Sequence, residues 1–170
     1  MAKTKTAKDS LTIMTNIVLP NDTNQLHNLF GGELLARMDR CASISATRHC
    51  ERRVVTASVN HVSFNHPIPE GGIVVLESKV SRAFGTSMEI YVDVWLDDPI
   101  AGKKIHTNEG IYTFVAVDEF NKPVPIPQME PETDLEKERF AAALRRKELS
   151  LILSGRMKAA DSVELRKLFV

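Results

Sequence analysis

The sequence predicts an α+β domain in which an antiparallel sheet curves around one long helix. The first observation is helical apolar periodicity from residue 31 to residue 49, after a strand-like segment at 11–20. The second is a series of β-favouring segments that follow it, separated by short turns. Short turns make consecutive strands antiparallel, and the single long helix is the element available to cover the apolar face of their sheet.

Five strands are expected, because each candidate combines β-favouring residues with a nearby turn signal. The segment from 86 to 97 is the clearest, since apolar residues occupy every second position from Met88 to Leu96. The turns contain proline and glycine, as in "HPIPEGG" at 66–72. The predicted strands are 11–20, 53–64, 73–84, 86–97 and 105–118.

The carboxy-terminal part is expected to be a helical extension. A proline-rich segment at 119–134 predicts an extended linker along the surface. A charged helix follows, with Gly155 as its expected end, and then a short helix or a frayed terminus. We therefore divide the chain into a domain at 8–130 and a carboxy-terminal helical extension at 131–170.

Charge and hydropathy exclude several classes of function. Lys plus Arg and Asp plus Glu each number 22, which argues against broad binding to nucleic acid or to an anionic membrane. No apolar run reaches the ~20 residues that span a bilayer, and no secretory signal follows the basic start. Cys41 and Cys50 would lie roughly 13 Å apart on one helix, too far for a disulfide. A cytoplasmic protein with reduced thiols is expected.

The long helix carries one residue that its amphipathic pattern does not explain. Asp39 falls at the edge of the apolar face, and no basic residue lies three or four positions away. Such a carboxylate is either hydrogen-bonded by another element or functional. The expected apolar face contains Leu34, Leu35, Met38, Cys41, Ala42, Ser45 and Ala46, and the polar face contains Glu33, Arg37, Arg40 and Arg48.

The start of this helix predicts a site for a polarised carbonyl oxygen. Gly31 and Gly32 leave the free backbone N–H groups accessible, at the positive end of the helix dipole. Asn28 could hold a carbonyl or water, or could be the helix N-cap. Asp39 lies about 12 Å along the helix from Gly31. The two groups can therefore share one site only if they come from two copies of the chain in a two-fold dimer.

Long stretches of the chain resemble the hot-dog-fold acyl-CoA thioesterases, of the brain-type acyl-CoA hydrolase group and its single-domain bacterial relatives. They are "NDTNQLHNLFGGELLARMDRCASISATRHC", "VVTASVNHVSFNHPIPEGGIV", "GTSMEIYVDVW" and "YTFVAVDEFNKPVPIPQMEPET", and the similarity covers roughly residues 10 to 145. The resemblance implies hydrolysis of acyl-CoA to fatty acid and CoA. It also implies homodimers, commonly assembled into hexamers as trimers of dimers.

The resemblance also implies roles for individual residues. Asp39 would be the general base or the nucleophile, Asn28 the catalytic asparagine, and Thr56 a hydrogen-bonding partner of Asp39. Gly31 and Gly32 would supply the oxyanion site. His27 departs from the family pattern, which often has glycine there. The candidates for binding CoA are Arg52, Arg53, Arg82, Gly85, Thr86 and Ser87.

Two alternatives remain on the same fold: a non-catalytic acyl-CoA sensor, and an enoyl-CoA hydratase or dehydratase. The latter usually pairs an Asp with a His, and "MDRCA" has no such His. The five histidines show no metal-ligand spacing, so no metal is expected. No G-x-S-x-G elbow occurs. No cofactor is expected, because CoA enters as part of the substrate.

Overall fold

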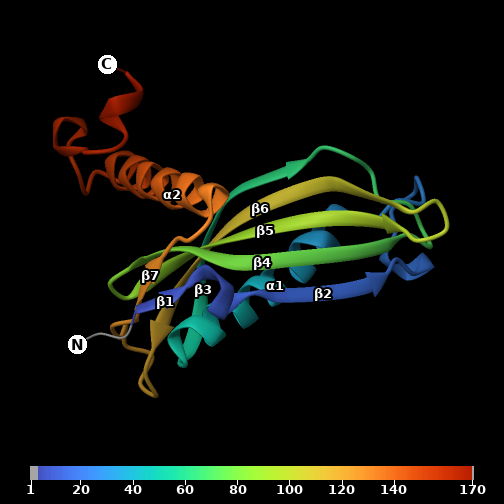
Figure 1. Cartoon of the computed structure of the whole chain (residues 1–170), viewed down its shortest axis with the longest axis horizontal. Helices are drawn as coiled ribbons and strands as arrows, with labels where there is room; N and C mark the ends of the chain where they lie inside the picture. The colour runs from blue at the N-terminus through green and yellow to red at the C-terminus, as the bar shows by residue number, and fades with distance from the viewer. Residues whose placement is uncertain (1–3, 170) are drawn as a thin grey trace.

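A twisted antiparallel sheet of five strands covers one side of helix α1 (Gly31–Cys50) in the computed structural model, which describes residues 4–169 (Figure 1). The strand order is β2–β4–β5–β6–β3. The predicted α+β architecture is confirmed. The strands are β2 (Thr12–Ile17), β3 (Arg53–Phe64), β4 (Ile73–Phe84), β5 (Ser87–Asp98) and β6 (Lys103–Val117).

The expectation that consecutive strands are neighbours is wrong at one connection. Strand β3 pairs with β6 at one edge of the sheet, whereas β4 lies three strands away beside β2. The connecting residues, 65–72, run along the loop that precedes α1. Leu29 N donates to the Ile68 carbonyl at 2.7 Å, and Glu70 N donates to the His27 carbonyl at 2.9 Å. This crossing holds the loop that precedes the helix, a non-local contact that turn signals do not encode.

Helix α1 packs closely on the sheet because its buried face is made mostly of small side chains. Gly110 of β6 also leaves room for this packing, since a Cβ there would require the end of the Met38 side chain to move. A buried hydroxyl pair joins the two layers, with 2.6 Å between the Ser45 and Ser78 oxygens. The predicted apolar face is confirmed for Leu34, Met38, Cys41, Ala42, Ser45 and Ala46, all buried.

The segment predicted as an extended linker contains a strand. Strand β7 (Gln128–Glu130) pairs in parallel with β1 (Thr4–Thr6), a two-stranded sheet that the sequence analysis did not predict. His49 at the end of α1 donates from Nε2 to the Pro127 carbonyl at 2.9 Å. Burial lowers the pKa of His49, which keeps the imidazole neutral in this contact. The division of the chain after residue 130 stays a prediction.

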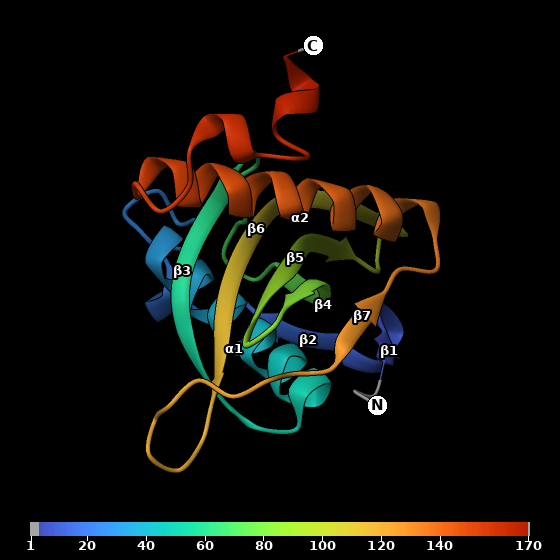
Figure 2. The same cartoon turned by 90° about the vertical axis from the view of Figure 1, so that its left-hand side faces the viewer.

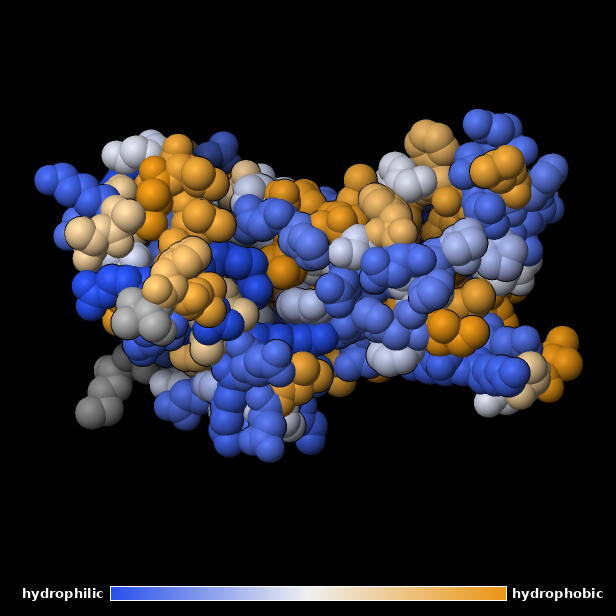
Figure 3. All heavy atoms as spheres, turned by 90° about the horizontal axis from the view of Figure 1, so that it is seen from above, coloured by the Kyte–Doolittle hydropathy of each residue, from blue (hydrophilic) through white to orange (hydrophobic). Residues whose placement is uncertain are grey.

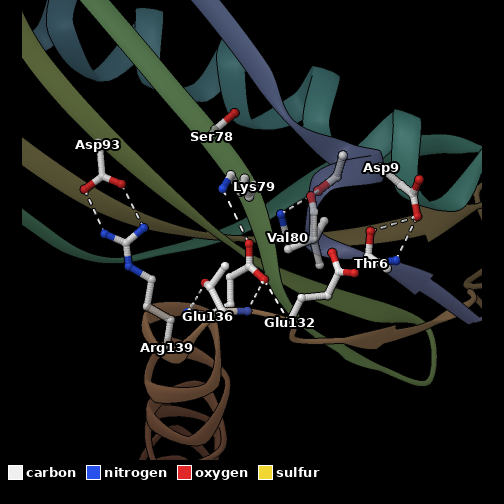
Figure 4. Close-up of polar contacts among 12 residues, drawn as sticks. Thr6, Asp9, Ser78, Lys79, Val80, Asp93, Glu132, Glu136 and Arg139 are labelled. Carbon is white, nitrogen blue, oxygen red and sulfur yellow. Dashed lines mark hydrogen bonds and ion pairs between the residues drawn. The ribbon is translucent and has the colours of Figure 1, made fainter.

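Helix α2 (Asp134–Leu153) lies across the outer face of the sheet, on the side opposite α1 (Figure 2). Ion pairs connect it to β5, with 2.8 Å between Arg139 and Asp93 and 2.7 Å between Arg146 and Glu89. Lys79 of β4 contacts Glu136 near the start of the helix, as Figure 4 shows beside the Asp93–Arg139 pair. No helix in residues 4–169 is long and apolar enough to cross a membrane.

The chain after α2 folds back onto the helix through one buried carboxylate. Gly155 has φ +71° and reverses the chain, as expected. Glu148 then accepts hydrogen bonds from the backbone N–H groups of Val163, Glu164 and Leu165, at 2.7–3.2 Å. The tail contains two 3₁₀ turns, Ala159–Asp161 and Arg166–Leu168. Leu153 and Phe169 in this part of the chain are exposed. Hydrophobic groups, drawn in orange, lie among polar ones over the surface in Figure 3.

We predict that Glu148→Gln releases the tail. Burial alone would raise the pKa of the Glu148 carboxyl, but the three backbone N–H groups and the Arg82 charge hold this pKa below its usual value. The tail is therefore stabilised above the ordinary Glu pKa and loses this stabilisation as pH falls through the lowered value. At neutral pH, we expect Glu148→Gln to lower the free energy of local opening of the tail by about 2 kcal/mol. Hydrogen exchange at residues 163–165 measures it, with the exposed Glu138→Gln as the control.

Candidate active site

Asp39 lies half-buried on α1, where a threonine of β3 holds it. Thr56 Oγ1 donates to Asp39 Oδ1 at 3.0 Å, which confirms the predicted contact. Asp39 forms no ion pair with any residue in the range 4–169. Tyr112 lies nearby and donates to the Leu35 carbonyl at 3.1 Å. Burial, with a further contribution from the Asp39 charge, raises the pKa of Tyr112. Asp39 thus has one hydrogen bond from a side chain, to Oδ1, and lies at the edge of an apolar layer.

The amino end of α1 presents bare backbone donors. The N-cap is Phe30, and no side chain caps the helix, so the N-cap alternative for Asn28 is wrong. The first helical hydrogen bond runs from Leu34 N to the Phe30 carbonyl. The N–H groups of Gly31 and Gly32 precede it and remain available to an acceptor at the positive end of the dipole.

A compact loop precedes these glycines, and the side chain of Asn24 organises it. Asn24 Oδ1 accepts hydrogen bonds from the backbone N–H groups of Leu26 at 2.9 Å and Asn28 at 3.3 Å. Both contacts use the amide oxygen, so the Asn24 amide nitrogen keeps its donors. His27 adopts φ +56°, which explains why glycine suits this position in the family pattern. The sequence analysis considered Asn28 and His27 of this loop and missed Asn24.

An open pocket of about 410 Å³ lies at this end of the helix. Asn24, Asn28 and Gly31 line it on the polar side. Its other walls are mostly apolar and come from Leu26, Leu29, Leu34, Phe64, Pro67 and Ile68, with His66 and Asn108 beside them. The pocket therefore combines hydrogen-bond donors with an apolar slot.

The residues predicted to bind CoA lie in different parts of the structure. Thr86 and Ser87 line a pocket of about 380 Å³ under α2, together with Arg146, Lys147 and Arg156. Burial, followed by the charge of Arg156, lowers the pKa of Lys147. The sequence analysis missed these basic residues, because only the packing of α2 on the sheet brings them beside the β4–β5 turn. Gly85 forms that turn with φ +69°.

The three predicted arginines lie elsewhere. Arg82 is packed between two rings, 3.9 Å from the Phe140 centroid and 5.6 Å from that of Phe84, and Nη1 donates to the Phe140 carbonyl. Arg82 therefore fixes α2 to the sheet. Arg52 and Arg53 line a separate hollow beside Asp118 and Glu119. Arg53 pairs with Val117 and Ser87 with Val115, so the two lie on either side of the end of β6.

Comparison with known proteins assigns the family. Residues 26–103 match the thioesterase superfamily. The chain is 42% identical to YkhA of Bacillus subtilis, an uncharacterized acyl-CoA thioester hydrolase, over 79% of this chain and 78% of that protein. The chain belongs to the acyl-CoA thioesterase family. Its hot-dog fold is shared with an apo-hexameric acyl-CoA thioesterase, with 41% identity, a TM-score of 0.84, and coverage of 86% of this chain and 94% of that one.

A second thioesterase structure includes the ligand. The Staphylococcus aureus acyl-CoA hydrolase, solved with butyryl-CoA, CoA and CoA disulfide, is 37% identical, with a TM-score of 0.83 and coverage of 86% of this chain and 90% of that one. That enzyme has also been studied with alanine in place of an asparagine at its position 28, an aspartate at 43 and a threonine at 60.

One cluster of possible metal ligands occurs outside these pockets. Ligand atoms of Asp93, His106 and Glu109 lie within 4.8 Å of one another, which sequence spacing did not reveal. Arg139 donates to both carboxylate oxygens of Asp93, at 2.8 and 2.9 Å, and compensates its charge. The cluster therefore already has a structural role in attaching α2. The expectation of no metal stays a prediction.

The loop that carries Asn24 is anchored to α1 by Arg37, and the predicted exposure of Arg37 is wrong. Its side chain is only 8% exposed and bonds Asp22 at 2.7 Å and Glu33 at 3.1 Å. Helical periodicity placed Arg37 opposite the core, but the loop folds over that face. Its Asp22 is the second carboxylate that pairs with Arg37, besides Glu33. The Arg37–Asp22 pair thus links the asparagine loop to the helix start.

We predict that Asp22→Ala destabilises the thioesterase by about 3 kcal/mol, because it removes one partner of a buried charge. The change also removes the hydrogen bond from Leu19 N to the Asp22 carboxylate. Arg40→Ala is the matched control, since Arg40 is 63% exposed and 3.9 Å from Glu33. Urea unfolding measures both variants. Equal free energies of unfolding for the two would contradict the anchoring role.

Proposed function

We propose that this thioesterase hydrolyses fatty acyl-CoA to free fatty acid and CoA, at sites shared by two copies of the chain. One observation carries the proposal. A single rigid helix holds an unpaired, half-buried carboxylate about 12 Å from its own bare amide end. Neither group completes a site alone, and an antiparallel second copy of the helix would supply each with the other.

The edge of the sheet supports the two-fold arrangement. Strand β3 is an edge strand, and its Val55 and Val59 side chains are 47% and 48% exposed. Pairing of β3 with β3 of a second copy would continue the sheet and cover these valines. The same pairing would set the two α1 helices side by side in opposite directions. A trimer of such dimers accords with the hexameric relative.

In the proposed reaction the thioester carbonyl accepts hydrogen bonds from the backbone N–H groups of Gly31 and Gly32. These donors stabilise the negative charge that develops on the oxygen. Asp39 of the second copy takes a proton from the attacking water, or attacks the carbonyl carbon itself. Thr56 fixes the orientation of Asp39 in either route. In the first route the C–S bond then breaks, and Asp39 returns the proton to the CoA sulfur, which leaves as the thiol beside the free fatty acid. In the second route the C–S bond breaks to leave a mixed anhydride on Asp39, and the thiolate takes a proton from water. A further water then hydrolyses the anhydride, which releases the fatty acid and regenerates the Asp39 carboxylate.

Asn24 is the asparagine that we assign to this site, in place of Asn28. In the Staphylococcus aureus enzyme the replaced residues are 28, 43 and 60, so the asparagine lies 15 residues before the aspartate and the threonine 17 after it. Here Asn24 and Thr56 have these spacings from Asp39. The free amide donors of Asn24 also point to a role at the carbonyl or the water. The backbone of Asn28 would hold Asn24 in place.

The two pockets account for the rest of the substrate. The apolar slot at the helix start would take the acyl chain. The phosphates would lie near Thr86, Ser87, Lys147 and Arg156, with Arg53 at the same end of the sheet. Such a reaction uses water and side chains alone, with neither cofactor nor metal.

We also propose that the enzyme works in the cytoplasm with its thiols reduced. Burial raises the pKa of Cys41 and of Cys50, so both are poor nucleophiles and remain thiols under reducing conditions.

We predict that Asp39→Asn lowers kcat by about a hundredfold or more while the fold is kept, because asparagine still accepts the Thr56 hydrogen bond. Release of free thiol from hexanoyl-CoA measures the rate, with the exposed Asp161→Asn as the control. Wild-type rates in Asp39→Asn would remove Asp39 from the mechanism. If the wild type binds acyl-CoA without releasing thiol, the non-catalytic sensor is favoured. If the wild type hydrates an enoyl-CoA, the hydratase is favoured.

Mixing two inactive variants tests the shared site. We predict that Asp39→Asn and Asn24→Ala chains, unfolded and refolded together, recover about a quarter of wild-type activity. Half of the randomly formed dimers are mixed, and each mixed dimer has one intact site of two. Activity no higher than that of the separate variants would show that Asn24 and Asp39 do not combine across two chains.

A further inference from the structure

Asn108 has an unpaired polar atom in the interior of the protein. It lies on β6, between Phe64 of β3 and Val94 of β5, and is 1% exposed. Its Nδ2 donates to the His66 carbonyl at 3.5 Å. Its Oδ1 has no hydrogen-bond partner in the part of the chain that the structure describes. Buried side-chain acceptors are nearly always satisfied, so a donor is expected to complete this one.

The surroundings of Asn108 identify where that donor comes from. Asn108 lines the pocket at the helix start, in company with Leu29, Leu34, Phe64 and Ile68. An aliphatic side chain would suit such walls better, since a buried amide oxygen among them costs free energy unless it is bonded. Its neighbour Thr107 shows the usual outcome, because that buried hydroxyl donates to the Val94 carbonyl at 3.1 Å. Oδ1 itself has almost no exposed surface, and this pocket is the open space that borders Asn108. An occupant of the pocket is therefore the donor that we consider.

We propose that Asn108 makes the acyl pocket selective for acyl groups that carry a hydroxyl. The hydroxyl would donate to Asn108 Oδ1, whereas an unsubstituted chain of the same length would leave this acceptor unpaired. A site built to bond a substrate hydroxyl discriminates against the analogue that lacks it. The inference rests on the proposed thioesterase function and adds the class of acyl group to it. Asn108 touches the chain away from the reacting carbonyl, so it determines specificity.

The test compares hexanoyl-CoA with monohydroxylated hexanoyl-CoAs that carry the hydroxyl at each successive carbon, by thiol release. The wild type is expected to hydrolyse at least one hydroxylated isomer with a kcat/KM about fivefold or more above that of hexanoyl-CoA, as one added hydrogen bond provides. Asn108→Leu keeps the size of the side chain and removes the acceptor. It should abolish this preference, measured as the ratio of kcat/KM for the hydroxylated isomer to kcat/KM for hexanoyl-CoA in the same variant.

Thr107→Val is the matched control. It changes an equally buried neighbour whose hydroxyl is already bonded, so the hydroxyl preference should persist in it. Thermal melting verifies that both variants fold. Asn108→Ser, which keeps a hydroxyl acceptor, replaces the leucine variant if that one does not fold, and should show a reduced preference.

The possible outcomes distinguish the hydroxyl selectivity of Asn108 from the proposed thioesterase activity. Hydrolysis of hexanoyl-CoA with no preference for any hydroxylated isomer would overturn the inference and leave the thioesterase in place. A preference that Asn108→Leu retains would overturn the role of Asn108. Failure of the wild type to release thiol from any of these substrates would overturn the proposed function, and the inference with it.

Discussion

Close contact between α1 and the sheet sets every distance in the proposed site. The helix approaches the strands through small side chains, and Gly110 gives the end of the Met38 side chain the space that a Cβ would take. Ser45 reinforces the contact, because its hydroxyl donates to the Ser78 carbonyl at 3.0 Å inside the core. A helix held this firmly cannot slide along its axis, so its glycine end and its carboxylate keep a constant separation. The precision of a catalytic arrangement depends on such rigid support.

Two parts of one helix therefore have different chemistry. The amino end offers backbone donors, the Asn24 amide and an apolar slot. Near the middle of the helix, Asp39 and Thr56 offer a carboxylate and its orienting hydroxyl. The Arg37–Asp22 pair holds the loop at the amino end, and the contact of Thr56 on β3 holds Asp39. The proposed site joins the amino end of the helix in one copy to the Asp39 region of another.

The sequence was sufficient for features that depend on local patterns. Alternation and helical periodicity predicted the five strands and α1, and the lack of a basic residue near Asp39 identified it as unusual. Features that depend on distant segments were missed or wrong. Arg37 follows the polar spacing of the helix, but its partner Asp22 lies in a loop. Strand β3 was placed beside β4, because nothing in 65–72 indicates that this segment crosses the helix end.

The asparagine that we propose for the site shows a different limit. Asn24 and Asn28 both lie in a polar loop, and each residue type is common in turns and caps. The hydrogen bonds of the Asn24 side chain distinguish them, and these depend on the fold of the whole loop. Lys147 and Arg156 were likewise indistinguishable from solvated charges until α2 was seen to lie over the β4–β5 turn.

The open edge at β3 has a consequence for how the chain must assemble. Its unpaired backbone groups and half-exposed valines would pair with any extended peptide, including a strand from a misfolded neighbour. A copy that stays alone for long after folding is thus exposed to sheet-to-sheet aggregation. Prompt association with an identical chain would cover this edge strand. Oligomer formation would then protect solubility as well as complete the proposed active site.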